Sequence, residues 1–302
     1  MKNYKLSICI PTNNRSGFLK KNLEKLGKII DPKNVEIIIG NDACTDNTSE
    51  IIQDFKNKYN KIKLIEKKFQ KRVFFDRIVL AMVKKASGKF CWLLGDDDFP
   101  DGGSVKKILS IINIYPELSL IHLNYSRFDN LLKKVTAKKM INGIQKDILF
   151  KSYEDFYFKH LENSYFKFLG THTITMSSDV VNREKWLRAS KKLRKYIGHN
   201  FIHSFVIGTI IKNPNSVYFI AKPQVQYLSN NHRVWPNDIW KDYNNVLLGY
   251  LKDIGYSQEK ISEMQKQQRE YEKREEVTKN KLFQFLSPII RPLYSYYQKL
   301  RA

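Results

Sequence analysis

Apolar and polar positions alternate in blocks along the first hundred residues, and each block predicts one element. Short apolar runs rich in β-branched residues predict buried strands, and the segments between them carry the apolar spacing of amphipathic helices. The predicted strands are residues 6–10, 35–39, 62–65 and 90–94. The predicted helices are residues 16–30, 48–59 and 75–85, and Ser16 is a candidate cap for the first of them. Strands that alternate with helices predict an α/β fold with a mostly parallel sheet and helices on both faces.

The pattern becomes less regular after residue 103. Up to about residue 226 it continues as mixed α/β, with strand-like runs at 120–125 and 216–220 and a basic helical stretch at 186–196. From about residue 238 it turns helical, and residues 257–280 are densely charged without a continuous apolar stripe. Such a stretch is typical of a solvated helix or of a connector without fixed structure.

We therefore expect two parts in the chain. Residues 1–235 are predicted to form one α/β domain, made of a first half over residues 1–102 and a second half over residues 103–235. Residues 236–302 are predicted to form a helical carboxyl-terminal extension.

Three consecutive aspartates, Asp96, Asp97 and Asp98, follow the fourth predicted strand directly after Gly95. Neighbouring carboxylates repel one another by about 1 kcal/mol per pair at 4 Å in water, and by more in a cleft. A fold tolerates such a cluster most easily when positive charge lies beside it, and carboxylate oxygens are ligands that suit Mg²⁺ or Mn²⁺. An acidic surface turn after a strand is the alternative interpretation.

Polar clusters follow two other predicted strands as well. Residues 12–15 come after the first strand, and Asn41, Asp42 and Asp46 come after the second. In parallel sheets of this kind, ligands bind outside the carboxyl ends of the strands. The three clusters therefore predict one binding site at that edge of the sheet.

The net charge of the chain gives a second indication of what the protein binds. The 302 residues include 53 Lys+Arg and 30 Asp+Glu, a net charge of +23, which favours an anionic partner such as nucleic acid, an acidic membrane surface or a phosphorylated ligand. The apolar fraction of 42% is that of a globular protein rather than a disordered one.

The three cysteines, Cys9, Cys44 and Cys91, lie in or beside predicted strands without the spacing of a zinc site. They are expected to be small apolar residues of a reduced, cytoplasmic protein. The amino terminus lacks the apolar region of a signal peptide, and no stretch reaches the roughly 20 apolar residues of a membrane span. We expect a protein that is cytoplasmic, or peripheral on the inner face of the cell membrane.

Three segments together resemble a known family. They are LSICIPTNNR at residues 6–15, VEIIIGNDACTDNT at residues 35–48 and ASGKFCWLLGDDD at residues 86–98. In this order and at these separations they resemble the strand and turn motifs of glycosyltransferase family 2. Asp76-Arg77, Cys91-Trp92 and the Glu184-Lys185-Trp186 element most resemble the abequosyltransferase-type members, which build bacterial O-antigen.

The resemblance implies a GT-A fold, a Rossmann-like α/β architecture, and transfer of a sugar from a nucleotide-diphosphate donor with inversion at the anomeric carbon. By that resemblance, Pro11, Thr12, Arg15 and Asp42 hold the nucleotide, and Asp42 accepts hydrogen bonds from the base edge. Capping of a turn through Asp46 and Thr48 is a structural role that Asp42 can have as well.

The resemblance also implies that the aspartates contact the ribose and a divalent cation, Mn²⁺ or Mg²⁺, which bridges the diphosphate. In the usual motif the first acid falls on Gly95, so Asp97 is the first candidate ligand, with Asp96 or Asp98 in support. Arg77 is expected to pair with the diphosphate or with Asp42, or else to be an exposed helical arginine.

Family members commonly supply the general base from a Glu-Asp pair, but the matching stretch here, residues 196–203, contains no acid. A histidine has a pKa suited to that role, so His203 and then His199 are the candidates, with Asp238 as a third. A histidine that simply packs on a helix face is the alternative for both.

Three further residues are assigned to the acceptor and phosphate region. His172 is expected to line the acceptor pocket, and Arg233 and Trp235 are expected to lie on a loop that closes over the donor phosphates.

The last segment, from Leu282 onward, mixes Phe, Leu, Ile and Tyr with Lys and Arg. This composition suits a segment in an anionic membrane interface, near a lipid-linked acceptor. Pro288 and Pro292 would break a long helix, which favours the alternative that the segment packs on the protein.

Three other functions compete with sugar transfer. A nucleotidyltransferase would need a Gly-rich basic loop after the first strand, where residues 12–17 have only Gly17. A nucleic-acid binder would agree with the charge, but no RNP, KH or zinc-finger signature is present, so no nucleic-acid partner is expected. A degenerate transferase that serves as a scaffold remains an alternative, because the acid is missing at residues 196–203.

Overall fold

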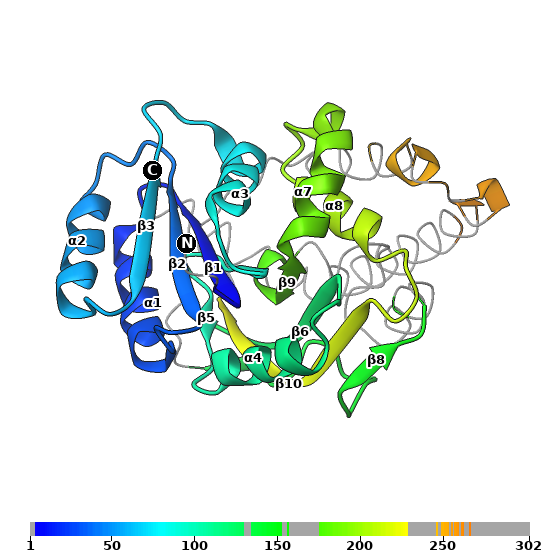
Figure 1. Cartoon of the computed structure of the whole chain (residues 1–302), viewed down its shortest axis with the longest axis horizontal. Coiled ribbons are helices and arrows are strands. Elements are labelled where there is room, and N and C mark those ends of the chain that lie inside the picture. Colours follow the sequence, from blue (N-terminus) through cyan, green and yellow to red (C-terminus); the bar gives the residue numbers. More distant parts are fainter. Residues whose placement is uncertain are drawn as a thin grey trace, which may run out of the picture. The chain divides into compact units, whose positions relative to one another are not determined.

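The computed structural model describes residues 4–129, 134–152 and 175–228, together with residue 156 and scattered positions between 246 and 266. The chain divides into two compact units, residues 1–250 and residues 251–302, and the first unit contains the sheet. Its ten strands follow the order β3-β2-β1-β4-β9-β6-β10-β5, with β7 paired to β6 and β8 paired to β10 (Figure 1).

The amino-terminal half is a parallel α/β unit, as the alternating pattern predicts. Strands β1 to β4 run parallel, and β1 lies between β2 and β4, with Leu6 opposite both Val35 and Phe90. The elements are β1 Leu6–Thr12, α1 Ser16–Ile29, β2 Val35–Asn41, α2 Thr48–Lys58, β3 Lys63–Lys68, α3 Phe74–Lys85 and β4 Phe90–Leu93. All seven elements predicted from the first hundred residues are confirmed to within a few residues.

The second half extends the same sheet with strands of mixed direction. Strand β9 is antiparallel to both β4 and β6, and β10 runs parallel to β6 through a register shift between Ile220 and Val225. The elements are β5 Phe99–Pro100, α4 Ser104–Ile114, β6 Leu120–Phe128, β7 Val135–Ala137, β8 Ile148–Phe150, β9 Asp179–Asn182, α7 Arg183–Lys192, α8 Ile202–Ile210 and β10 Val217–Leu228. Two 3₁₀ helices complete the set, η2 Met176–Ser178 and η3 Arg194–Tyr196.

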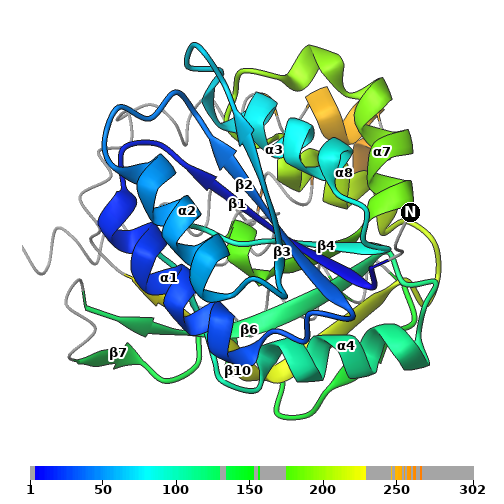
Figure 2. The ribbon, with the colours of Figure 1, turned by 60° about the vertical axis from the view of Figure 1, so that its left-hand side comes forward.

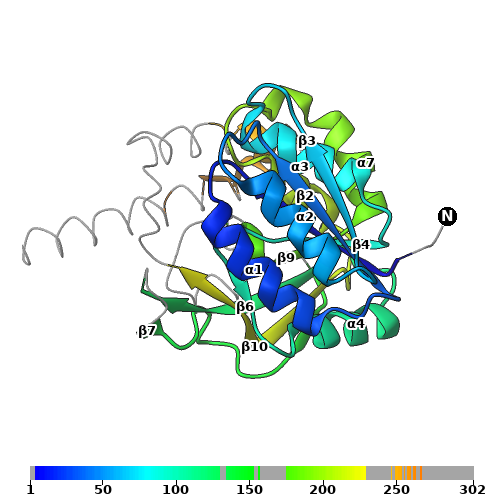
Figure 3. The same cartoon turned by 90° about the vertical axis from the view of Figure 1, so that its left-hand side faces the viewer.

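Helices cover both faces of the sheet. The apolar sides of α1, α2 and α4 share one core with the strands, and α1 and α2 lie side by side on that face (Figure 2). Helix α3 packs against β1 and β2 from the opposite face, next to α7 and α8. Figure 3 shows α1 and α2 in front of the strands. Among the described residues, no helix is long and apolar enough to span a bilayer.

One detail of the predicted elements is wrong. Ser16 does not cap α1 through its side chain; instead its backbone N–H donates to Asp46 Oδ2 at 3.0 Å. A carboxylate 30 positions along the chain takes the place of the local cap, so the helix start is fixed by the turn after β2. Cys9 and Cys91 are buried in β1 and β4 as expected, and Cys44 is partly buried in that same turn.

The amino ends of the parallel strands are joined by a buried carboxylate. Glu36 accepts hydrogen bonds from Ser7 Oγ at 2.8 Å and from the backbone and hydroxyl of Ser87, and Lys63 pairs with it at 3.1 Å. Burial acts to raise the pKa of Glu36, but these bonds outweigh it and hold that pKa below its usual value. Gly88 N–H donates to the same Ser7 hydroxyl at 2.8 Å.

Substitution of Gly88 by alanine is expected to destabilise the protein by about 2 kcal/mol, because the new Cβ would overpack this joint. That Cβ would lie 2.6 Å from the backbone nitrogen of Ser7, which cannot move without shifting β1. Urea unfolding measures the change. Gly17→Ala is the matched control: its Cβ meets nothing within 4 Å, and alanine suits α1, so the stability should stay equal or rise. Equal stability of the two variants would contradict the prediction.

Candidate active site

A cavity of about 280 Å³ lies at the carboxyl ends of the parallel strands. The strand ends, the turn after β4 and the start of α3 all contribute to its wall. The lining residues are Pro11, Thr12, Asn13, Arg15, Asp42, Arg72, Phe75, Ile78, Asp96 and Met176. The structure thus brings Pro11, Thr12, Arg15, Asp42 and Asp96 together, the five nucleotide-binding candidates other than Arg77.

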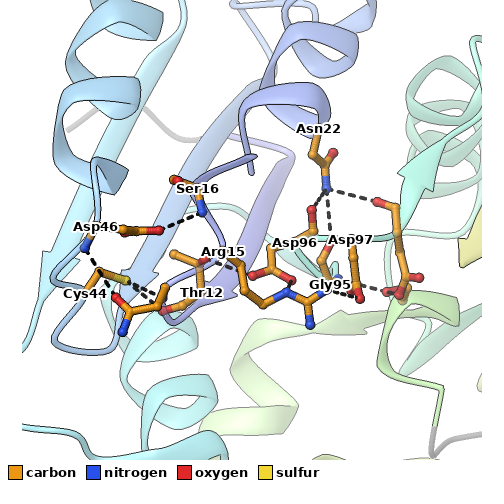
Figure 4. Close-up of polar contacts among 12 residues, drawn as sticks. Thr12, Arg15, Ser16, Asn22, Cys44, Asp46, Gly95, Asp96 and Asp97 are labelled. Atoms are coloured by element: carbon orange, nitrogen blue, oxygen red, sulfur yellow. Dashed lines mark hydrogen bonds and ion pairs between the residues drawn. The ribbon is translucent and has the colours of Figure 1, made fainter. Parts of the chain in front are cut away.

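Arg15 supplies the positive charge that the aspartate triplet requires. Its Nη2 donates to Asp97 Oδ2 at 2.5 Å, and its Nε lies 3.4 Å from Asp96 Oδ1 (Figure 4). Thr12 Oγ1 donates to the other oxygen of Asp96 at 2.8 Å. Asp96 and Asp97 are both 1% exposed, so these contacts replace water as the partners of two buried carboxylates. The triplet is therefore a buried turn, and an acidic surface turn is excluded.

The turn that carries the triplet is held from two sides. Asn22, a fully buried residue of α1, donates from Nδ2 to the carbonyl oxygens of Gly95 at 3.0 Å and Asp98 at 2.9 Å. On the other side, Ser177 Oγ donates to Asp98 Oδ2 at 2.5 Å and accepts from Gly95 N–H at 2.8 Å. These contacts fix the orientation of the turn, in which Asp96 lines the cavity.

Gly95 occupies the place of the first acid in the family motif, and the structure shows why no side chain is accommodated there. A Cβ at this position would lie 2.8 Å from Asp98 Oδ2 and 3.3 Å from Asp97 Oδ1. The space that a side chain would need is thus filled by the two following carboxylates.

Asp42 forms the opposite wall of the cavity. Its Oδ1 accepts from the backbone N–H of Val73 at 2.6 Å, and Arg72 Nε lies 3.8 Å from its Oδ2. The Asp42 side chain is almost buried, whereas 56% of the Arg72 side chain is exposed. The pair presents a carboxylate and a guanidinium side by side at the cavity wall.

The turn after β2 is stabilised by Asp46 rather than by Asp42. Asp46 Oδ1 accepts from the backbone and hydroxyl of Thr48. Its Oδ2 accepts from Ser16 N–H (Figure 4). Burial acts to raise the pKa of Asp46, but these bonds lower it below its usual value. Asp46 thereby ties the start of α2 to the start of α1 and leaves Asp42 to face the cavity.

The donor set agrees with the chemistry of Mg²⁺ or Mn²⁺, because the turn offers only carboxylate oxygens. Mg²⁺ commonly binds one or two carboxylates and takes its other ligands from phosphates and water. In the part of the chain that the structure describes, no group of three or more Asp, Glu, His or Cys side chains is arranged to hold a cation. The turn thus offers carboxylate oxygens that suit such a cation, and Arg15 contacts one of them, Asp97 Oδ2, in this structure.

Two of the candidate bases, His199 and His203, lie on a loop and at the start of α8, and a second buried aspartate organises this region. Asp76, at the start of α3, accepts hydrogen bonds from the backbone N–H groups of Gly198 at 2.7 Å, Asn200 at 3.1 Å and Ile202 at 3.1 Å. Burial raises the pKa of Asp76 above its usual value, although these bonds act in the opposite direction. The loop and the start of α8 are therefore attached to α3.

The two histidines of this region differ in accessibility. His203 is 2% exposed on α8, and its ring packs edge-to-face against Phe75 at 5.3 Å, so it lies behind a residue that lines the cavity. His199 lies on the loop itself and is partly exposed. The other assigned residues, Asp238, His172, Arg233 and Trp235, fall outside the described residues.

Arg77 is exposed on α3, which was the alternative stated for it, and it does not line the cavity. The arginine that faces Asp42 is Arg72, five positions earlier. Asn22 and Ser177 were not identified from the sequence, because both act on a turn more than 70 positions away in the chain. No local pattern marks such residues.

Comparison with known proteins agrees with this geometry. The chain is 26% identical over 222 residues to the abequosyltransferase RfbV of Salmonella typhimurium, an alignment that covers 73% of this chain and 65% of that protein. This chain thus matches about two thirds of the length of its curated relative.

Solved structures show the same GT-A fold. One is TarS of S. aureus, residues 1–349, in complex with UDP, with a TM-score of 0.61 at 14% identity over 86% of this chain and 69% of that one. The same protein in complex with UDP-GlcNAc gives a TM-score of 0.61 at 13% identity, over 86% of this chain and 70% of that one.

The family model described as glycosyl transferase family 2 matches residues 7–189, a range that contains the three sequence motifs apart from Leu6, and both walls of the cavity. The chain therefore belongs to glycosyl transferase family 2.

Proposed function

We propose that this protein is a glycosyltransferase that moves a sugar from a nucleoside-diphosphate donor to a hydroxyl group of an acceptor, with inversion at the anomeric carbon. One observation carries the proposal: Thr12, Arg15, Asp42 and Asp96 line a single cavity at the carboxyl ends of the strands in a family 2 chain. Support comes from the relative named abequosyltransferase and from the TarS structures that hold UDP and UDP-GlcNAc.

We infer that Asp42 and Arg72 read the edge of the base. A carboxylate accepts a hydrogen bond from a ring N–H, and a guanidinium beside it donates to a ring carbonyl. Uracil and thymine present an N–H flanked by two carbonyls, whereas cytosine presents no such N–H. The pair therefore favours a uridine or thymidine diphosphate over a cytidine diphosphate.

A divalent cation, Mn²⁺ or Mg²⁺, is proposed to bind with the diphosphate at Asp97, with Asp98 in support. Once bound, such a cation neutralises charge that develops on the leaving diphosphate. Arg15 now contacts Asp97, so its guanidinium is expected to turn toward the phosphates when the donor binds. Asn22 and Ser177 keep the turn in place during this exchange.

The second half of the domain, residues 103–235, is expected to supply the base that takes the proton from the acceptor hydroxyl. In inverting transfer the acceptor oxygen forms a bond to the anomeric carbon while the bond from that carbon to the diphosphate oxygen breaks, and the hydroxyl proton passes to a base. Of the two histidines that the structure describes, His199 is the more accessible one, while His203 is placed to support Phe75. Asp238 remains a third candidate.

The acceptor is proposed to be a glycan or a lipid-linked precursor of a surface polysaccharide. The name of the Salmonella relative supports polysaccharide synthesis, and the charge of +23 supports an anionic partner. His172, Arg233 and Trp235 are retained as predicted contacts of the acceptor and the phosphates.

Calorimetric titration with UDP, CDP, GDP and dTDP, each with Mn²⁺ and with EDTA, tests the donor site. Binding of UDP or dTDP that weakens in EDTA is the expected result. Absence of binding to all four diphosphates would contradict the proposal and would favour a degenerate scaffold. Salt-sensitive binding of nucleic acid without nucleotide affinity would favour a nucleic-acid binder.

Arg72→Gln is expected to raise the dissociation constant for UDP about tenfold, because one charge-assisted hydrogen bond to the base is lost. Arg77→Gln is the matched comparison, since Arg77 lies five positions later, near the start of α3, but does not line the cavity, and it should change that constant less than about twofold. Titration of both variants with UDP decides between the two arginines. A larger effect at Arg77 would contradict our assignment.

A further inference from the structure

Two segments near the cavity carry cations and no acidic residue. Residues 67–75, KKFQKRVFF, hold four lysines and arginines and three phenylalanines. Residues 188–196, RASKKLRKY, hold five lysines and arginines. Both lie in the described part of the chain, at the β3–α3 connection and at the end of α7 with η3.

These segments belong to one surface. Asp76, the residue after the first segment, binds the backbone of Gly198 and Asn200, which follow the second segment by two and four positions. The β3–α3 connection and the far end of α7 both lie at the top of the view in Figures 1, 2 and 3, which are related by rotation about the vertical axis. Like charges are therefore gathered on one side of the site.

The cations of this surface are exposed. They are Lys67, Lys68, Lys71, Arg72, Arg188, Lys191, Lys192, Arg194 and Lys195, which we call the basic rim. Glu184 pairs with Arg188, which leaves the charge of the rim strongly positive. The rim reaches the cavity at Arg72, which is one of the lining residues.

The rim also displays an aromatic ring at a strained position. Phe74 is 61% exposed and has φ of 61°, a backbone conformation that bulky residues rarely adopt. The Arg72 guanidinium lies 4.9 Å from the centre of the Phe74 ring, and Lys67 Nζ lies 5.2 Å from that of Phe69. The fold thus holds an apolar ring outward within a basic surface.

We propose that the basic rim docks the protein on a bilayer that contains anionic lipids, with Phe74 in the interfacial layer. Cations beside aromatic rings are the usual composition of such contacts. A nucleic-acid site would instead use the faces of the rings for base stacking, whereas here cations lie over the faces of Phe69 and Phe74. The segment from Leu282 onward has the same aromatic and basic composition, and stable peripheral binding generally needs two such signals.

This inference goes beyond the proposed transfer reaction, and its test requires no sugar donor. The probe is a vesicle of phosphatidylcholine with about one quarter phosphatidylglycerol, compared with phosphatidylcholine alone, and the readout is the partition coefficient of the full chain. The variant replaces Lys191, Lys192, Arg194 and Lys195 with glutamine. Its partition onto anionic vesicles is expected to fall about 100-fold.

The matched control removes the same charge from the other edge of the sheet, by replacing Lys28, Lys33, Lys58 and Lys61 with glutamine. These four lysines are exposed near the ends of α1 and α2 and in the connections that follow them. Partition of the control should fall less than about threefold. Phe74→Trp should in addition show more fluorescence quenching by brominated lipid than the unsubstituted chain, whose four tryptophans give the background signal.

Several results would overturn the proposal. Equal losses in the two fourfold variants would mean that binding follows net charge alone, and no loss in either would place binding elsewhere. Binding of a single-stranded oligonucleotide through the rim, without vesicle binding, would assign the rim to nucleic acid. Titration with UDP is measured separately on each variant, so failure of the donor proposal is distinguishable from failure of this one.

Discussion

Replacement of Asp97 by asparagine should lower kcat/KM for sugar transfer by about 1000-fold. Asp97 is the carboxylate that the proposed cation needs, and it is 1% exposed beside Arg15, so no other side chain can move into its place without rearrangement of the turn. Asparagine keeps the size and one acceptor oxygen but removes the charge that binds a hard cation. Release of the nucleoside diphosphate, followed over time, measures the rate.

A second readout separates loss of the cation from general damage. UDP binding to the unsubstituted protein should weaken when EDTA replaces Mn²⁺, whereas UDP binding to Asp97→Asn should be nearly the same in both conditions. Asp101→Asn is the matched control, because Asp101 lies four positions away, beyond β5 and outside the aspartate triplet. It should retain most of the activity.

Full activity of Asp97→Asn would contradict the assignment of the ligand. If that variant remained active and Asp96→Asn lost activity with its EDTA response, the cation would belong to Asp96, which lines the cavity and contacts Thr12. Retention of an EDTA response in both variants would place the cation away from the triplet.

The parallel half of the fold was predictable because its signals are local. Four apolar runs, each closed by a glycine, a proline or a polar turn, mark buried parallel strands, and the helices between them carry a regular apolar face. The second half gives weaker signals. Strand β9, Asp179–Asn182, is too short to show a period, and it is defined by its antiparallel pairing with β4 and β6.

The position of the site was predictable from the strand ends, but its internal contacts were not. Arg15 is 82 positions from Asp97, and Ser177 is 79 positions from Asp98, so their contacts follow from the sheet order and not from spacing. The buried pair of His122 and Asp179 could not be predicted for the same reason: their side chains meet at 2.9 Å because β6 and β9 are neighbours in the sheet. Burial raises the pKa of that Asp179 carboxyl.

Arginines were the least predictable class, because a long flexible side chain is located by its partner and not by its own segment. Asp76 and Arg77 are adjacent and together resemble a family motif, but their environments differ: Asp76 is buried and Arg77 is exposed. Arg72 and Phe75, on either side of the strained residue Phe74, line the cavity, whereas Arg77 does not.

Asp76→Ala is expected to lower the free energy of unfolding by about 3 kcal/mol, since at least three backbone N–H groups lose one charged acceptor. Those N–H groups belong to Gly198, Asn200 and Ile202, and the Asp76 carboxylate that accepts from them is 2% exposed. Urea unfolding gives the change in stability. Asp54→Ala, at an exposed position of α2, is the control and should remain within about 0.5 kcal/mol of the unsubstituted protein.

The same carboxylate links this loop to pH. Because burial raises the pKa of Asp76 above its usual value of 3.8, the folded protein binds this proton more tightly than the unfolded chain does. Its stabilising contribution is therefore complete below pH 3.8 and decreases as the pH rises through the folded-state pKa. The difference in stability between the unsubstituted protein and Asp76→Asn should narrow over that interval. If this difference in stability widened with rising pH, the prediction would be contradicted. The backbone hydrogen bonds would then outweigh burial and lower the pKa of Asp76, and an ionised Asp76 would hold the loop that carries His199.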